Sequence, residues 1–157
     1  NYRMTELQAA VGLAQMKKID FSLKKQKKNY TNIKNGIKNN NFYSFRKFPK
    51  GTKHTFEALV FNLPSKKDAK DLFKILVKEE IITKNLPDAY DWHFAGTWNH
   101  IISTIPIFKD KKVKDLFPVS KDLLSRSISI MIFIKMKSKQ IKKIVKVLNE
   151  FAEERTK

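Results

Sequence analysis

Residues 1–20 read NYRMTELQAAVGLAQMKKID, and their order predicts a helix that begins at a capping motif and is apolar over most of its surface. Thr5 suits the cap position, and Gln8 follows three residues later, which is the spacing of a capping box. Most side chains from Leu7 to Met16 are apolar. Because a helix that is apolar on more than one side is normally buried, we expect it to pack against a part of the molecule outside these 157 residues.

The rest of the chain mixes helix and strand patterns. Residues 20–39 carry one apolar stripe at helical spacing, which predicts a long helix lying on a surface. Residues 55–63, TFEALVFNL, are rich in β-forming side chains and precede Ser65, a candidate cap for the next helix. Further elements are predicted as a short strand at 81–83, a short helix from Pro118 to Leu124, a strand with one buried face at 127–134, and a last helix capped by Ser138.

These elements predict an α+β fold with two N-terminal helices, followed by a small three-layer-like domain of about three strands and three helices. Polar residues at 39–41 interrupt the helical pattern, so we divide the chain into linking helices at 1–40 and a small domain at 41–157. The connection at 86–106, LPDAYDWHFAGTWNHIISTIP, is irregular and rich in aromatic and histidine side chains. Loops held by a scaffold carry many binding residues, so this connection is the most function-like stretch.

The formal charge of +18 has two interpretations. A basic surface can bind a polyanion such as nucleic acid or a membrane. However, 29 of the 33 basic residues are Lys, whereas specific phosphate and base contacts favour Arg, and the lysines are scattered among 11 Asn and 16 Ile. That combination is typical of a genome rich in A and T. We interpret most of the charge as solvated surface and expect no nucleic-acid partner, with a lysine-rich polyanion-binding module as the alternative.

Several classes of protein are disfavoured by what the sequence lacks. It contains no Cys, no signal-peptide pattern and no apolar run near the roughly 18 residues of a membrane span. We therefore expect a cytoplasmic protein with no membrane partner. His93 and His100 are seven residues apart in irregular sequence, so no metal site is expected. Nucleotide-binding glycine motifs and the hydrolase motif G-x-S-x-G are also missing.

The opening stretch resembles a segment of the DegT/StrS-type sugar aminotransferases, which are fold-type I enzymes dependent on pyridoxal 5'-phosphate (PLP). In that family N-Y-R-M-T-E-x-Q-A-A-x-G-L-A-Q-L-x-K-L-D leads into the helices that join the cofactor domain to the C-terminal small domain. Here Met16 and Ile19 are conservative departures. The resemblance continues through HTF at 54–56 and FPVSKDLLSRSISI at 117–130, where the usual proline is absent. Within the family, LPDAYDWHFAGTWNHI and LLSRSISI are most similar to the branch that makes 8-amino-3,8-dideoxy-manno-octulosonate, an amino-sugar acid of lipopolysaccharide.

The resemblance implies that the chain is the C-terminal part of a longer, homodimeric enzyme. This enzyme would transfer an amino group from an amino acid, usually glutamate, to a keto or aldehydo sugar such as 3,8-dideoxy-8-oxo-manno-octulosonate. The family's Schiff-base lysine and most of its phosphate ligands would lie upstream of Asn1. The 157 residues would then hold no catalytic residue and be inactive alone. A relative that keeps the fold but has lost the lysine is a further alternative.

Three residues are candidates for binding at the N-terminal side and near the first strand. By resemblance, Asn1 binds the cofactor phosphate of the neighbouring subunit through its amide, although a plain loop role is the alternative. Arg3 is expected to contact that phosphate, or a substrate phosphoryl group, or a carboxylate across the interface. His54 corresponds to a position at the active-site mouth, where it would hold a sugar hydroxyl or carboxylate, and a surface or capping role is the alternative.

The aromatic connection supplies the other substrate-binding candidates. Aromatic faces stack on sugar rings, and imidazoles donate hydrogen bonds to hydroxyls or carboxylates. The alternative is that the two tryptophans form a small satellite core. The four candidates are Trp92, His93, Trp98 and His100.

Overall fold

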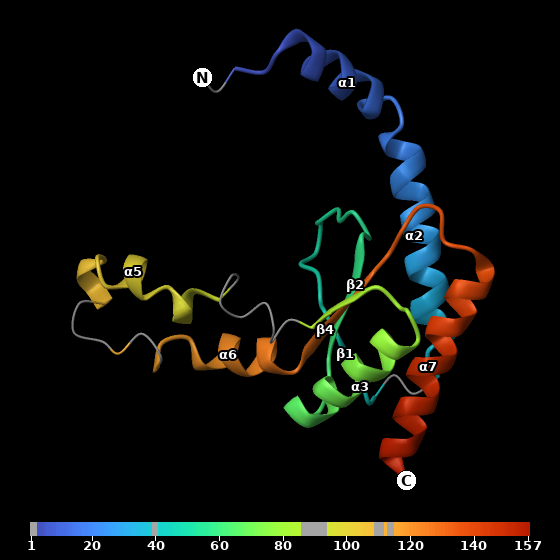
Figure 1. The fold of residues 1–157 in the computed structure, drawn as a ribbon, viewed down its shortest axis with the longest axis vertical. Helices are drawn as coiled ribbons and strands as arrows, with labels where there is room; N and C mark the ends of the chain where they lie inside the picture. The colour runs from blue at the N-terminus through green and yellow to red at the C-terminus, as the bar shows by residue number, and fades with distance from the viewer. Residues whose placement is uncertain (1–2, 39–40, 86–93, 109–111, 113–114) are drawn as a thin grey trace.

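The computed structural model describes residues 3–38, 41–85, 94–108, 112 and 115–157. In this part of the chain the centre of the fold is a four-stranded antiparallel sheet in the order β1-β2-β4-β3. The strands are β1 (Ser44–Phe45), β2 (Ala58–Asn62), β3 (Thr83–Asn85) and β4 (Ser127–Met131). Three long helices, α2 (Ile19–Gly36), α3 (Lys66–Lys78) and α7 (Ser138–Thr156), pack on the sheet, with α2 and α7 side by side (Figure 1). The predicted α+β class is confirmed, and β1 is an additional strand.

The core lies between one face of the sheet and these helices. In the antiparallel register of β2 and β4, Leu59 is opposite Ile130 and Phe61 is opposite Ile128, so the four side chains share a face. All four are at most 1% exposed. The helices add their apolar stripes to this face, including Tyr30, Ile33, Ala69, Leu72, Leu76, Ile144, Leu148 and Phe151. The apolar stripes predicted for α2, α3 and α7 are thereby confirmed.

Strand β4 differs from its prediction because it is central in the sheet. The Ser-Ile alternation from Ser127 predicted one buried face over 127–134, but the strand ends at Met131 and its first four residues are all buried. Helix α6 (Pro118–Ser125) approaches the second face, where the Ser127 hydroxyl donates to the Leu123 carbonyl oxygen at 2.5 Å. Small serines are therefore covered rather than solvated, which periodicity alone does not predict.

Two helix starts test the predicted caps. Ser65 caps α3, since its hydroxyl oxygen accepts from the Asp68 N–H at 3.1 Å. The predicted cap of α7 is wrong by one residue, because Ser138 is the first helical residue and Lys137 occupies the cap position. The Lys137 N–H donates to the side-chain oxygen of Gln140 at 2.8 Å, which satisfies the helix start without a serine hydroxyl.

Other boundaries shift by a few residues. Strand β2 begins at Ala58 rather than at 55, and the strand predicted at 81–83 starts only at Thr83. The connection predicted as irregular contains short helical turns, which are η2 (Ala95–Thr97), α5 (Asn99–Ile102) and η3 (Pro106–Phe108). Residues 86–93 of that connection lie outside the described part of the chain. None of the described helices is long and apolar enough to cross a membrane.

Helix α1 (Glu6–Met16) has the predicted capping box but no buried residue. The Gln8 N–H donates to Thr5 Oγ1 at 3.3 Å, and the Thr5 N–H donates to Gln8 Oε1 at 2.9 Å. Leu7 is 76% exposed and Leu13 is 68% exposed. Figure 1 shows α1 directed away from the sheet beyond the start of α2. The apolar surface of α1 is thus uncovered within the described residues.

Candidate functional site

His54 is surrounded by three aromatic rings, and we call Tyr30, Phe48, His54 and Phe56 the aromatic clamp. The imidazole is stacked on Phe48 with ring centroids 3.8 Å apart and an interplanar angle of 4°. Phe56 lies 3.8 Å away at 48°, and Tyr30 lies 6.0 Å away in an edge-on arrangement. Tyr30 also meets Phe56 edge-on at 5.4 Å. These contacts restrict the orientation of the imidazole ring.

The segment between β1 and β2 forms one side of this clamp, and α2 forms the other. The Arg46 N–H donates to the Val60 carbonyl oxygen at 3.1 Å, so the chain stays beside β2 after β1 ends. His54 and Phe56 are two residues apart in this segment, before β2 begins at Ala58. Phe56 has φ of 58°, a left-handed conformation that is rare for a bulky residue and that neighbouring contacts must hold.

Three cations lie around the clamp. Lys27 Nζ is 5.8 Å from the centroid of Phe56, and Arg46 Cζ is 5.3 Å from that of Phe48. Lys34 Nζ is 5.5 Å from the centroid of Phe45, on the neighbouring strand β1. Partial burial, followed by the charges of these three cations, lowers the pKa of His54 below its usual value of 6.5. A neutral imidazole can both donate and accept one hydrogen bond, which suits a sugar hydroxyl.

The other described candidates lie on a separate arm of the molecule. Trp98 directly precedes α5, and His100 is exposed on it. Figure 1 shows α5 at the outer end of this arm, beyond α6 and away from the sheet. Within the described residues, no ring contact or hydrogen bond joins His54 to Trp98 or His100. The chain by itself therefore does not bring these candidates into one site, and Trp92 and His93 lie outside the described residues.

Within the described residues, the arm has a small core that contains three phenylalanines. Phe94 and Phe108 each meet Phe117 edge-on, with centroid distances of 6.5 and 6.1 Å. Phe94 and Ile102 are only 4% and 5% exposed. Gly96 packs so closely that an added Cβ would lie 2.2 Å from the Phe94 ring. This core does not test whether the two tryptophans form a satellite core, because Trp92 lies outside the described residues.

Arg3 lies before the start of α1, and Asn1 is outside the described residues. The Arg3 side chain is exposed, two residues ahead of the cap residue Thr5. A guanidinium group can donate two hydrogen bonds to a phosphate, and a helix N-terminus favours negative charge. The contact of Arg3 with a cofactor phosphate stays a prediction.

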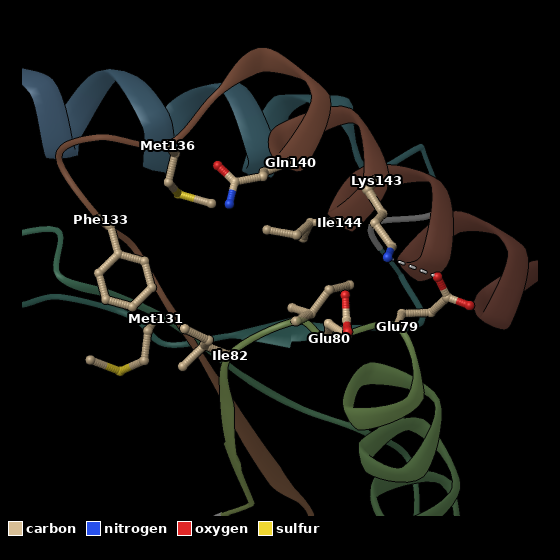
Figure 2. A pocket seen from close by; sticks show the side chains of 10 residues that line it. Glu79, Glu80, Ile82, Met131, Phe133, Met136, Gln140, Lys143 and Ile144 are labelled. Atoms are coloured by element: carbon tan, nitrogen blue, oxygen red, sulfur yellow. Dashed lines mark ion pairs between the residues drawn. The ribbon is translucent and has the colours of Figure 1, made fainter.

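Other hollows lie elsewhere on the described part of the small domain. Figure 2 shows a pocket of about 210 Å³ between the end of α3, the end of β4 and the start of α7. The ion pair between Lys143 and Glu79, 3.2 Å apart, lies at its side, and no predicted site residue lines it. A groove of about 600 Å³ crosses the second face of the sheet and is lined by Ser44, Phe45, Arg46, Lys47, Val60, Asn62, Leu123, Leu124, Ser127 and Ser129. Arg46 thus belongs both to this groove and to the surroundings of the clamp.

Sequence reasoning missed Phe48, Arg46, Lys27 and Lys34 as neighbours of His54. Lys27 and Lys34 share a helix face with Tyr30, which a helical wheel reveals. Their contact with the segment before β2 depends on tertiary packing. Among the described residues, no group of three or more His, Cys, Asp or Glu side chains is placed to hold a metal ion.

Comparison with known proteins gives consistent matches along the chain. Residues 1–149 match the DegT/DnrJ/EryC1/StrS aminotransferase family. The GDP-perosamine synthase of Escherichia coli O157:H7 is 27% identical over 151 residues, which are 96% of this chain and 37% of that protein.

Solved structures share the fold at lower identity. Helicobacter pylori PseC, an aminotransferase involved in the biosynthesis of pseudoaminic acid, matches with a TM-score of 0.67 and 18% identity over 98% of this chain and 39% of its own. The PLP form of Spr1654 from Streptococcus pneumoniae matches with a TM-score of 0.64 and 13% identity over 97% of this chain and 36% of its own. The chain therefore spans well under half the length of the proteins it resembles.

Proposed function

The chain belongs to the DegT/DnrJ/EryC1/StrS aminotransferase family, and from this we propose that it is the C-terminal part of a PLP-dependent sugar aminotransferase. The observation that carries the proposal is the family match over residues 1–149. The uncovered apolar surface of α1 supports it, because such a helix requires a partner that the described residues do not provide. In this proposal residues 1–40 link to a large cofactor domain and residues 41–157 form the small domain, with α2 contributing to its core.

Aminotransferases of this family use PLP, and neighbouring structures include PLP and pyridoxamine phosphate forms. When bound, PLP supplies an electron sink and carries the amino group between substrates. We propose that Arg3 and the N-terminus of α1 contribute to holding its phosphate in a neighbouring subunit, with the Asn1 amide as a further donor. Pairing of Arg3 with a carboxylate across the subunit interface is the alternative role. The lysine that reacts with the cofactor belongs to the part of the enzyme outside this chain.

For the acceptor we propose a keto or aldehydo sugar, with glutamate as amino donor. The neutral His54, oriented by the aromatic clamp, supports a role in holding a sugar hydroxyl. The proposed specific acceptor is 3,8-dideoxy-8-oxo-manno-octulosonate for lipopolysaccharide. The similarity to GDP-perosamine synthase supports a nucleotide-linked sugar as the competing acceptor. Product formation with each acceptor, measured with the same enzyme preparation, distinguishes them.

We also propose that the enzyme is a homodimer, as the resemblance to the family implies. The arm that carries α5 extends away from the sheet (Figure 1), so additional surfaces are needed to enclose a sugar between this arm and the aromatic clamp. We propose that the large domain and the second subunit supply those surfaces in a cytoplasmic enzyme. Trp92 and His93 would join the same sugar-binding region.

The first experiment is to express the full-length polypeptide that contains these 157 residues. The protein is incubated with PLP, reduced with borohydride and digested for mass spectrometry. We expect a pyridoxyl group on one lysine outside residues 1–157, since none of the 29 lysines here inherits the catalytic role. A folded protein without this adduct would contradict the aminotransferase proposal and favour a relative that has lost the lysine.

A further inference from the structure

We propose that the pocket between the end of α3, the end of β4 and the start of α7 binds a small organic cation, an ammonium group carried on an apolar body. The described lining of this pocket includes no residue of the aromatic clamp. The pocket holds about 210 Å³, whereas sites for drug-sized ligands hold about 300–1,000 Å³. Its size therefore suits a ligand of one ring with a short head group. The inference rests on the lining residues and does not depend on the proposed amino transfer.

One wall of the pocket is apolar and comes mainly from the end of β4 and the residues after it. Figure 2 shows Met131, Phe133 and Met136 along this wall, with Ile82 beside them. Phe133 is 43% exposed, whereas Ile144 in the deeper part of the pocket is 3% exposed. Aromatic faces attract organic cations, and methionine side chains adapt to ligands of different shape. This wall therefore suits the apolar body of an ammonium compound.

The other side of the pocket carries two carboxylates and one ammonium group (Figure 2). Lys143 Nζ lies 3.2 Å from Glu79 Oε2, so these two charges are paired with each other. None of the ion pairs among the described residues includes Glu80. One carboxylate is thus left over at the pocket, although the formal charge of the chain is +18. A cationic head group would supply the missing partner through a charge-assisted contact.

The backbone at the end of α3 holds Glu80 in place. The Glu80 N–H donates to the Val77 carbonyl oxygen at 3.0 Å, and the Ile81 N–H donates to that of Leu76 at 2.9 Å, which is the pattern of a Schellman motif. Glu80 has φ of 56°, the left-handed conformation for which this motif usually selects glycine. The carboxyl end of a helix also favours positive charge over negative charge. A carboxylate at this position is therefore unfavourable for α3 by itself, and a bound cation would offset that effect.

The lining also distinguishes this ligand from other classes. A carboxylate ligand would meet two glutamates, and its natural partner Lys143 is already paired. A neutral apolar ligand would leave the Glu80 charge beside it without a partner. The side-chain oxygen of Gln140 accepts from the Lys137 N–H at 2.8 Å, so this amide is held at the start of α7. An ammonium compound is the class that uses both the apolar wall and the unpaired carboxylate.

The test uses the full-length protein loaded with PLP and benzyltrimethylammonium as the probe, because a quaternary ammonium cannot form an imine with the cofactor. Methionine methyl groups are labelled with ¹³C, and two resonances are assigned from their loss in Met131→Leu and Met136→Leu. We expect the probe to shift both resonances saturably. Benzoate, an anion of similar shape, should leave them unchanged. The titrations are run in about 0.15 M salt, where charges more than about 8 Å away are largely screened.

Matched variants separate the local carboxylate from the overall charge. Glu80→Gln should weaken binding of the probe about tenfold, the effect of losing one charge-assisted contact. Glu153→Gln removes the same charge from an exposed position of α7 outside the pocket and should leave the affinity unchanged. Phe133→Leu keeps an apolar side chain without the ring face and should weaken binding about two- to fivefold.

Glu80→Gly guards against a variant that loses binding because it unfolds. Glycine suits the left-handed position after α3, so this variant should raise the thermal midpoint while weakening the probe to the same extent as Glu80→Gln. Loss of affinity in a more stable protein reports the carboxylate and not the fold.

Three results would overturn the proposal. The first is the absence of any response of Met131 and Met136 to millimolar probe, as expected if another part of the enzyme fills the pocket. The second is an equal response to benzoate, and the third is an equal loss of affinity in Glu153→Gln. The measurement needs no amino transfer, and the pyridoxyl-lysine experiment needs no ligand in this pocket. Failure of the cation site and failure of the proposed function are therefore distinguishable.

Discussion

The chemistry of His54 depends on neighbours that come from two parts of the sequence. Phe48 and Phe56 flank its ring from the same segment, and Tyr30 reaches it from α2. Burial by these rings and repulsion from nearby cations act in the same direction, since both disfavour the protonated imidazole. His54 should therefore remain a neutral hydrogen-bonding group at pH values where an ordinary surface histidine begins to ionise.

This lowered pKa predicts how stability depends on pH. An unfolded His54 ionises near its usual pKa of 6.5, whereas the folded pKa is lower. Between these two pKa values the unfolded chain binds more protons, so the free energy of unfolding decreases as the pH falls through this window. We expect the thermal midpoint of the wild-type protein to fall more steeply on acidification below 6.5 than that of His54→Gln.

The matched control for this measurement is His100→Gln, which removes an exposed histidine from α5. A His54→Gln slope equal to that of the wild type would contradict the described environment of His54. The comparison uses slopes, because the loss of stacking on Phe48 is expected to lower the midpoint at every pH.

At the scale of elements, helix starts are determined by short-range hydrogen bonds. The Thr5–Gln8 pair and the Ser65–Asp68 pair both act between residues three positions apart. Ser65 also donates to Asp68 Oδ2 at 2.6 Å. Such local bonds need no tertiary contact, which explains why these starts were predictable. Ser138 is not the cap of α7. The backbone N–H of Lys137, the residue before it, donates to the side-chain oxygen of Gln140.

A pair of serine variants tests this distinction. Ser65→Ala removes the acceptor for the Asp68 N–H and should lower the free energy of unfolding by about 1 kcal/mol. Ser138→Ala changes a first-turn residue that does not cap α7 and should alter it by less than about 0.5 kcal/mol. The free energy of unfolding of both variants is measured by urea denaturation, with one m-value used for all proteins. Equal losses in the two variants would contradict the assigned start of α7.

At the scale of the whole molecule, the packed centre and the two extensions have different character. The sheet and helices α2, α3 and α7 enclose a continuous apolar core. Helix α1 and the arm with α5 extend from this centre in Figure 1, and α1 exposes leucine, valine and methionine side chains. Large exposed apolar surfaces mark sites of association. The uncovered helix is the feature that most clearly distinguishes this chain from a self-contained domain.

Substitutions at Leu13 and Leu148 measure the difference between the exposed helix α1 and the buried core. Leu13 is 68% exposed and Leu148 is 0% exposed. In the 157-residue chain, Leu13→Lys should change the free energy of unfolding by less than about 0.5 kcal/mol, whereas Leu148→Ala should lower it by about 2–5 kcal/mol. In the full-length protein, Leu13→Lys should become strongly destabilising, because the lysine charge would enter a buried interface. An unchanged full-length protein would show that α1 stays exposed there.

The sequence by itself determined the α+β class, the main helices and two of their caps. These features depend on apolar periodicity and on hydrogen bonds between residues close in the chain. The resemblance to the family identified His54 as a candidate residue. The apolar pattern identified α1 as a helix in need of a partner. The predicted boundaries were wrong where other elements intervene, as at β4, whose first serine, Ser127, donates to a carbonyl oxygen of α6.

Only the tertiary structure decided which side chains meet. The approach of Tyr30 to His54 and of Lys27 to Phe56 involves residues distant along the chain. Single-residue patterns carry no information about such pairs, since each contact depends on the packing of α2 against the sheet. The sequence therefore determined which local elements form, and long-range packing decided how their side chains combine into a charged and aromatic site.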